Sequence, residues 1–316
     1  MKTVLVFEAL KEEDRRALEQ EFGGLHFVYG DNPNWPGYLD TASAIVGFLP
    51  EEYRFLLKSL PALELVQLPF AGYEGWPERV ACPLANASGS FGLAISEYLI
   101  SAILFFYRRY PFLLENRKKK EWNRNIGTID SIYGKTILVL GCGDLGSTFA
   151  RSVKALGAHT IGLARRRRTV PGFDVVDTLD HLHRYLPLSD IVVGTLPSSP
   201  ATHHLLTLDD FSRMKPDALF ANVGRGDLVA LDVLEKVMAQ HRIRGMILDV
   251  CEIEPLPADC PLWEDENVFI TPHISGDESL PETKKRLWQI IRTNLHALEQ
   301  GEPFIHIVNR PQSDRS

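Results

Sequence analysis

Three glycines between a strand-like and a helix-like stretch are the clearest chemical feature of this 316-residue sequence. The segment TILVL is rich in β-branched residues and leucine, and GCGDLG follows it directly, with glycines at Gly141, Gly143 and Gly146. In a strand–loop–helix unit, the first glycine permits a tight turn, the second lets backbone N–H groups approach a pyrophosphate, and the third lets the helix pack closely. The helix N-terminus then faces the anion. The spacing therefore predicts a dinucleotide-binding loop, with an ordinary glycine-rich turn as the alternative.

Four consecutive arginines, Arg165 to Arg168, follow the next predicted strand at 159–163. About 20 residues beyond such a glycine loop, NAD-binding proteins usually carry an acidic residue that binds the ribose 2′-hydroxyl. Ala164 offers no acceptor here, whereas guanidinium groups suit a 2′-phosphate. The sequence therefore predicts a preference for NADP(H) over NAD(H), with Arg165 and Arg166, nearest the strand end, as the contacts. A solvated basic loop is the alternative.

An arginine, a glutamate and a histidine follow three later strand-like stretches, at Arg225, Glu254 and His273. Taken singly, each has an ordinary explanation, as a surface turn, an exposed carboxylate or a loop hydrogen bond. Together, they supply what the reduction of a 2-oxo acid requires: a cation for the substrate carboxylate and carbonyl, and a proton donor for the carbonyl oxygen. Imidazole changes its charge near neutral pH, and a carboxylate beside His273 favours the protonated form.

The motifs that carry these residues, LFANVGRGDLV, MILDVCEIEPLP and VFITPHISG, resemble those of the D-isomer-specific 2-hydroxyacid dehydrogenases, and in particular glyoxylate/hydroxypyruvate reductases. The similarity covers nearly the whole chain, with 29 residues from Arg225 to Glu254 and 19 from Glu254 to His273. The resemblance implies that these three residues are catalytic and that Arg225 and His273 also contact the substrate.

Weaker motifs extend the resemblance to further contacts. LPFAGYEGW is similar to the family's GxGxD loop, whose backbone N–H groups bind the substrate carboxylate, so Ala71 and Gly72 are implied as contacts. Phe70 and Glu74 depart from that pattern. The glycine loop and later strand ends add implied cofactor contacts at Asp144, Leu145, Leu196, Pro197, Val223 and Asp249. For Asp249, contact with the nicotinamide amide competes with simple capping of the neighbouring loop.

Strand-like and helix-like stretches alternate on both sides of an apolar helix predicted over 94–109. Strands are predicted at 3–7, 44–48 and 63–68, and then at 136–140, 159–163, 191–194, 218–222, 245–250 and 268–271. This rhythm indicates parallel sheets with ligands at their carboxyl edges. With the resemblance, it predicts an α/β fold of two doubly wound parallel-sheet domains. A Rossmann cofactor domain, 94–280, is inserted into a flavodoxin-like substrate domain formed by 1–93 and 281–316.

Composition excludes several other classes of protein. The chain is 45% apolar and 24% charged, with seven net negative charges, which is typical of a globular protein and argues against a nucleic-acid partner. Its most apolar stretch, 98–107, is too short to span a bilayer, so no membrane association is expected. The four cysteines show neither disulfide nor zinc-ligand spacing, which predicts no metal and a reducing, cytoplasmic location.

These observations predict an enzyme that reduces a small 2-oxo acid such as glyoxylate or hydroxypyruvate to the D-2-hydroxy acid with NADPH, with His273 as the acid/base. A phosphoglycerate dehydrogenase-type enzyme and a dinucleotide-sensing, corepressor-like binding protein are the alternatives on this scaffold. Phe70, Tyr73 and Trp76 suit either an apolar pocket for a branched substrate or the domain core. The resemblance also implies a homodimer, with the apolar helix at 95–106 either at its interface or buried within one chain.

Overall fold

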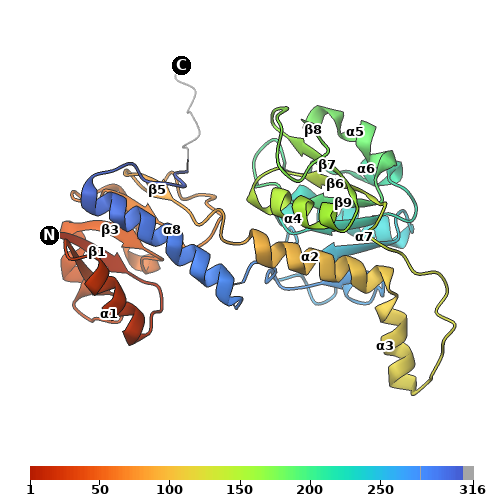
Figure 1. Cartoon of the computed structure of the whole chain (residues 1–316), viewed down its shortest axis with the longest axis horizontal. Helices are drawn as coiled ribbons and strands as arrows, with labels where there is room; N and C mark the ends of the chain where they lie inside the picture. The colour runs from red at the N-terminus through yellow and green to blue at the C-terminus, as the bar shows by residue number, and fades with distance from the viewer. Residues whose placement is uncertain (278, 309–316) are drawn as a thin grey trace. The chain divides into compact units, whose positions relative to one another are not determined.

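The computed structural model describes residues 1–277 and 279–308 and divides the chain into two compact units (Figure 1). The first unit combines Met1–Ser90 with the described residues from 279 onward, and the second comprises Phe91–Asp277. Each unit contains one parallel β-sheet. The predicted α/β class with two parallel sheets is therefore confirmed.

The first unit has five parallel strands in the order β2-β1-β3-β4-β5. This is the flavodoxin-like order, in which the strand sequence reverses between β1 and β3. The strands are β1 (Lys2–Val6), β2 (Leu25–Tyr29), β3 (Ala42–Val46), β4 (Leu65–Gln67) and β5 (Leu84–Ala85). β2 and β5 were not predicted, and β5, with two residues, is too short to show a pattern.

The helices of the first unit are α1 (Glu12–Glu21) and α8 (Pro281–Gln300), together with the 3₁₀ turns Trp35–Thr41 and Glu51–Lys58. The first turn of α1 contains three acidic residues, which interact favourably with the positive N-terminal end of the helix dipole. Proline begins α8 and Gly301, at φ 73°, ends it. Trp76 is 8% exposed and belongs to the core, against which Phe70 and Tyr73 pack. These aromatic residues therefore fit the core interpretation rather than an open substrate pocket.

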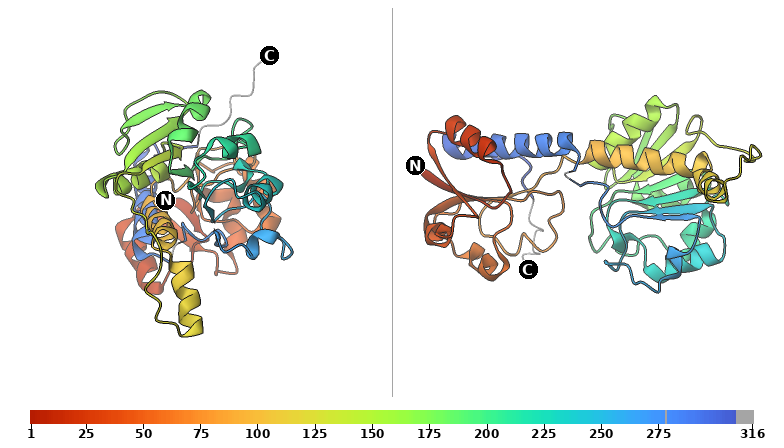
Figure 2. Two further views of the ribbon diagram at one scale, coloured as in Figure 1. Left: turned by 90° about the vertical axis from the view of Figure 1, so that its right-hand side faces the viewer. Right: turned by 90° about the horizontal axis from the view of Figure 1, so that it is seen from below.

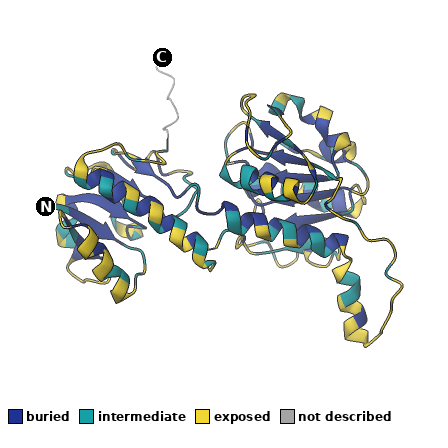
Figure 3. Ribbon diagram, viewed as in Figure 1, coloured by how far each residue is buried: buried dark blue, intermediate teal, exposed yellow. Residues whose placement is uncertain are grey.

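The second unit has seven parallel strands in the order β12-β11-β10-β9-β6-β7-β8. They are β6 (Thr136–Leu140), β7 (His159–Ala164), β8 (Val175–Thr178), β9 (Ile191–Gly194), β10 (Leu219–Asn222), β11 (Gly245–Leu248) and β12 (Val268–Ile270). Helices cover both faces of this sheet, as Figure 2 shows, and its central strands are buried throughout (Figure 3). The strand order reverses between β6 and β9, which is where doubly wound proteins bind their ligands.

The helices of the second unit are α2 (Gly92–Tyr107), α3 (Tyr110–Lys119), α4 (Asp144–Ala155), α5 (Leu182–Tyr185), α6 (Leu208–Arg213) and α7 (Leu231–Ala239). The apolar α2 packs against α4 and buries Leu99, Ile103 and Phe106 inside this unit. Burial within one chain therefore accounts for these apolar residues of α2. Across the two described stretches, no helix combines the length and apolarity that crossing a bilayer requires.

Candidate active site

The glycine loop joins the carboxyl end of β6 to α4, at the edge where the strand order reverses. At Gly141, with φ +110°, a Cβ atom would lie 2.7 Å from the Thr195 Oγ1 atom, and at Gly146 it would lie 2.0 Å from the Gly141 carbonyl oxygen. Both positions therefore require glycine. A Cβ on the exposed Gly143 would meet nothing within 4 Å, so the start of α4 faces open space. This combination is what close approach of a pyrophosphate needs.

The remaining predicted cofactor residues follow the carboxyl ends of neighbouring strands. Asp144 and Leu145, both half-buried, form the first turn of α4, and the Asp144 Oδ2 atom is buried without a hydrogen-bond partner among the described residues. After β9, the Thr195 hydroxyl donates to the carbonyl oxygens of the β6 end at 3.0 and 3.1 Å, which ties the two loops together. Buried Leu196 and exposed Pro197 follow it. Buried Val223 follows β10. The structure thus brings these residues to one sheet edge.

The four arginines after β7 divide into two pairs. Arg167 Nε donates to Asp177 Oδ1 at 2.6 Å, and Arg168 Nη2 donates to the Cys142 carbonyl oxygen in the glycine loop at 3.3 Å. Arg165 and Arg166 form no side-chain hydrogen bond or ion pair with any residue that the structure describes. The pair nearest the strand end is therefore available to an anion.

The predicted catalytic residues follow three neighbouring strands: Arg225 follows β10, Glu254 follows β11 and His273 follows β12. The His273 Nδ1 atom lies 2.9 Å from Glu254 Oε2, and both side chains are partly exposed. Glu254 Oε1 also accepts a hydrogen bond from the Cys251 N–H at 3.1 Å. His273 Nε2 has no partner within the described part of the chain, so it is available for proton transfer.

The Arg225 loop packs directly against the loop that carries Glu254. A Cβ atom at Gly226 would lie 1.9 Å from the Cys251 carbonyl oxygen, so no other residue fits between these backbones. The Asn222 side-chain amide donates to the Arg225 carbonyl oxygen at 2.9 Å, and Arg225 Nη1 donates to the Gly224 carbonyl oxygen at 2.8 Å. The guanidinium is half-buried at the sheet edge. Tertiary packing therefore sets where the loops carrying Arg225 and Glu254 lie.

Asp249 is 2% exposed and caps the loop that carries His273. Its Oδ1 atom accepts from the Thr271 hydroxyl at 2.6 Å, and both carboxylate oxygens accept from backbone N–H groups of the following loop residues at 2.9 and 3.0 Å. Its carbonyl oxygen accepts from the His273 N–H at 2.8 Å. The capping alternative is thus observed. Thr271 also bonds the Tyr98 hydroxyl at 2.6 Å, and no sequence motif indicated either residue.

The predicted substrate contacts Ala71 and Gly72 lie in the first unit, in the loop after β4. Two hydrogen bonds shape this loop: the Asn86 amide donates to the Ala71 carbonyl oxygen at 2.7 Å, and the Ala87 N–H donates to the Phe70 carbonyl oxygen at 3.0 Å. Within residues 1–277 and 279–308, the N–H groups of Ala71 and Gly72 donate to nothing. These donors are therefore available to an anionic ligand.

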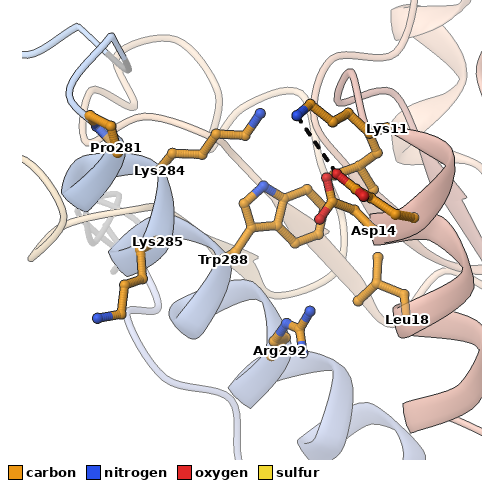
Figure 4. Close-up of a pocket in the computed structure, with 10 residues that line it drawn as sticks. Lys11, Asp14, Leu18, Pro281, Lys284, Lys285, Trp288 and Arg292 are labelled. Atoms are coloured by element: carbon orange, nitrogen blue, oxygen red, sulfur yellow. Dashed lines mark ion pairs between the residues drawn. The ribbon is translucent and has the colours of Figure 1, made fainter.

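A pocket of about 350 Å³ in the first unit lies between α1 and α8 (Figure 4). Lys11 and Asp14 line it from α1 and the residue before it, and Lys284, Trp288 and Arg292 line it from α8. None of the predicted site residues borders it. Among the described residues, no group of three or more histidine, cysteine, aspartate or glutamate side chains is arranged to hold a metal ion.

Comparison with known proteins agrees with this geometry. Residues 100–275 match the family described as D-isomer specific 2-hydroxyacid dehydrogenase, NAD binding domain. The chain is 27% identical to the glyoxylate/hydroxypyruvate reductase B of Pectobacterium carotovorum subsp. carotovorum, over 97% of this chain and 98% of that one.

Solved structures show the same fold. A D-isomer specific 2-hydroxyacid dehydrogenase family protein from Aeromonas salmonicida is 30% identical with a TM-score of 0.85, covering 98% of this chain and 99% of that one. A D-isomer specific 2-hydroxyacid dehydrogenase from Xanthobacter autotrophicus, solved with NADPH and MES, is 25% identical with a TM-score of 0.81, covering 98% of both chains. The chain therefore belongs to the D-isomer-specific 2-hydroxyacid dehydrogenase family and is an NAD(P)-dependent oxidoreductase.

Proposed function

We propose that this protein reduces a small 2-oxo acid of the glyoxylate or hydroxypyruvate type to the corresponding D-2-hydroxy acid, with NADPH as the preferred cofactor. The observation that carries the proposal is the 2.9 Å contact between His273 Nδ1 and Glu254, beside the loop of Arg225. The glyoxylate/hydroxypyruvate reductase relative supports this substrate class.

Each catalytic side chain has a distinct task in the proposed reaction. Arg225 binds the substrate carboxylate and polarises the carbonyl group. Protonated His273 donates its Nε2 proton to the carbonyl oxygen and becomes neutral, while Glu254 orients the ring through Nδ1 and stabilises its charged form. Bound NADPH supplies the hydride that the carbonyl carbon accepts. In the first unit, the N–H groups of Ala71 and Gly72 are proposed as carboxylate contacts.

The cofactor site fits the dinucleotide in two ways. The open space at Gly143 accommodates a pyrophosphate at the N-terminus of α4. Arg165 and Arg166, which pair with no residue in 1–277 or 279–308, carry charge suited to a 2′-phosphate. The relative solved with NADPH supports this choice of cofactor. We propose contacts from the glycine loop and the neighbouring strand ends, at Gly141, Gly143, Asp144, Leu145, Gly146, Arg165, Arg166, Leu196, Pro197, Val223 and Asp249. The unit Phe91–Asp277 is accordingly the proposed cofactor domain and the other unit the proposed substrate domain.

The test is oxidation of NADPH and NADH, followed at 340 nm, with a panel of 2-oxo acids. We expect the highest kcat/KM with glyoxylate or hydroxypyruvate, and higher values with NADPH than with NADH. In the reverse assay, preferential reduction of NAD+ or NADP+ by 3-phosphoglycerate would favour the phosphoglycerate dehydrogenase alternative. Tight NADPH binding without turnover of any acid would favour the dinucleotide sensor and contradict the proposal.

Two further properties belong to the same proposal. The four cysteines are free thiols, which fits a reducing cytoplasmic location.

A homodimer is proposed through α3 and the segment 120–134, because Tyr110, Trp122 and Tyr133 expose 48%, 96% and 77% of their surface there. The partner side of this contact is a second copy of the same chain.

A further inference from the structure

A group of polar side chains links the loops that follow β9, β10 and β11. We name this group the histidine clasp and define it as His203, His204, Asp227 and Glu252. The His204 Nε2 atom lies 2.5 Å from Glu252 Oε1, and the His203 Nδ1 atom lies 3.5 Å from Asp227 Oδ2. The two imidazole rings stack with centroids 3.9 Å apart. Residues from three separate loops are therefore connected through two adjacent histidines.

Backbone groups complete the clasp. The His204 N–H donates to the Asp227 carbonyl oxygen at 2.7 Å, and the Leu231 N–H donates to Glu252 Oε2 at 2.9 Å. The Leu231 hydrogen bond, followed by that of His204, holds the pKa of Glu252 below its usual range, so this carboxylate is charged at neutral pH. Ser198, from the first of the three loops, donates to Asp227 Oδ2 at 2.5 Å. Glu252 therefore uses both carboxylate oxygens to hold neighbouring loops.

His204 has a φ of +50°, which is uncommon for residues other than glycine. The left-handed region disfavours residues with a Cβ atom, and glycine adopts it most easily. A histidine at this position therefore has a less favourable backbone free energy than a glycine would have. Its imidazole forms a hydrogen bond with the Glu252 carboxylate. The strain therefore coincides with the contact that joins the loop after β9 to the loop after β11.

The clasp is adjacent to the proposed catalytic residues. Asp227 is the second residue after Arg225, and Glu252 is the second residue before Glu254. Between them, a Cβ atom at Gly226 would lie 1.9 Å from the Cys251 carbonyl oxygen and 2.6 Å from the Glu252 nitrogen. Because these backbones are in direct contact, a shift of Glu252 displaces both the Arg225 loop and the Glu254 loop.

We propose that His204, acting through Glu252, is a positioning residue that sets the separation of Arg225 and Glu254 for the reduction. This proposal rests on the proposed function of those two residues. His204 and Glu252 touch no reacting atom in the proposed reaction, and their effect is geometric. A displacement of about 1 Å at a reacting centre lowers the rate by roughly 100-fold, so a modest loop shift has a measurable effect.

The kinetic test compares variants of the clasp that differ in one property. His204→Gly keeps the positive φ and removes the imidazole, and Glu252→Ala removes both of its hydrogen bonds. We expect kcat/KM for the 2-oxo acid to fall about 10- to 100-fold in each, with the Kd for NADPH changed less than about twofold. Glu252→Gln keeps an acceptor for the Leu231 N–H and a hydrogen bond to His204, and we expect it to restore most of the activity.

His183→Ala is the matched control, because the largely exposed His183 contacts the buried Asp210 at 2.9 Å elsewhere in the same unit. We expect its kinetic constants to equal those of the wild type. Unchanged kcat/KM in folded Glu252→Ala or His204→Gly protein would overturn the proposal. A rate loss in Glu252→Gln as large as that in Glu252→Ala would also overturn it.

Amide hydrogen exchange separates this proposal from the proposed function. Faster exchange is expected in segments 224–228 and 251–254 of Glu252→Ala, by about fivefold or more, with no change in His183→Ala. If the wild type turns over no 2-oxo acid, the proposed function is wrong, and the exchange rates alone decide whether the clasp positions these loops. Unchanged exchange in Glu252→Ala overturns the clasp proposal whatever the kinetics show.

Discussion

Two of the hydrogen bonds that hold His273 have different consequences. Its side-chain Nδ1 contacts Glu254, and its backbone N–H donates to the Asp249 carbonyl oxygen at 2.8 Å. The first contact orients the ring and leaves Nε2 available, while the second holds the backbone at φ +54°. Contacts within the second unit thus hold both the ring and the backbone of this histidine. At the residue scale, this preorganisation is the basis for the proposed proton transfer.

Replacing the imidazole without disturbing the backbone tests that role. Asparagine tolerates positive φ better than most residues, so His273→Asn keeps the loop conformation and removes the acid/base. We expect kcat to fall about 10²- to 10⁴-fold while the Kd for NADPH stays within about twofold, as measured by steady-state kinetics and fluorescence titration. His241→Asn, at φ +49° after α7, is the matched control and should retain full activity. Turnover by His273→Asn comparable to wild type would exclude the assignment.

Among the secondary-structure elements, the connection between β7 and β8 carries four arginines, of which two are bonded within the chain. Arg167 bonds the buried Asp177 on β8, and Arg168 bonds the glycine loop. These contacts anchor the C-terminal half of the arginine run to the sheet, while Arg165 and Arg166 pair with none of the described residues. A rigid base that presents two unpaired guanidinium groups is suited to recognising a phosphate.

That division of the arginines predicts a preference for NADPH. In the double variant Arg165→Ala/Arg166→Ala, we expect the KM for NADPH to rise about 10- to 100-fold and the KM for NADH to remain nearly constant. The reason is that only NADPH carries the 2′-phosphate. Arg242→Ala is the control, because Arg242 is exposed just before β11, at the amino edge of the sheet. An equal loss with both cofactors would contradict the predicted contact.

The ion pair in this connection makes the stability of the second unit depend on pH. The Arg167 guanidinium, with the Thr178 N–H and the Tyr185 hydroxyl, holds the pKa of Asp177 well below its usual range. A lowered pKa in the folded state means that the stabilisation is present above about pH 4, the ordinary aspartate value, and is lost as pH falls through the folded value.

Arg167→Gln removes the main cause of this shift. We expect the variant to have a Tm roughly 1–3 °C below wild type at pH 7, since Arg167 is largely exposed to solvent. The difference should shrink as the pH is lowered from 4 towards 2, because Asp177 is then protonated in the unfolded chain, and the folded wild type must release that proton to keep its ion pair. Calorimetry of the apoprotein from pH 7 to pH 2 measures both quantities. A Tm difference that grows on acidification would refute the assigned cause.

For the whole molecule, the main candidate for a protein–protein contact is α3 with residues 120–134, where several large side chains are exposed. Tyr110 and Leu114 are 48% and 43% exposed on α3, and Trp122 is 96% exposed just after it. In Figure 1, α3 and the following segment project away from the sheet of their own unit. Large apolar side chains grouped on a protruding element are typical of protein–protein interfaces.

The proposed homodimer can be tested by sedimentation equilibrium. We expect the wild type to have twice the 35.6 kDa chain mass at micromolar concentration, and Trp122→Glu to sediment as a monomer, because a charge buried without a partner weakens an apolar contact. Phe55→Glu, at a 77% exposed aromatic residue of the first unit, is the control and should remain dimeric. A monomeric wild type would contradict the dimer, and a dimeric Trp122→Glu would contradict this interface.

Features that depend on local chemistry could be predicted from the amino-acid sequence. The glycine loop, β6 and β9 were predicted because glycine spacing and apolar runs reflect backbone conformation and burial at neighbouring positions. β8 was missed because it is an edge strand whose single buried residue is Asp177, so it shows no apolar run. The reductase chemistry was predicted from the residue types at three strand ends.

Contacts between side chains from distant parts of the chain could not be predicted in this way. Asp249 had two possible roles in the sequence, and the capping contacts to a loop more than 20 residues away became visible only in the fold. The same holds for the division among the four arginines and for the His204–Glu252 contact, which spans 48 residues of sequence. Such pairs depend on how strand ends from distant parts of the chain pack at one sheet edge. That packing is a cooperative property of the whole unit and leaves no local pattern.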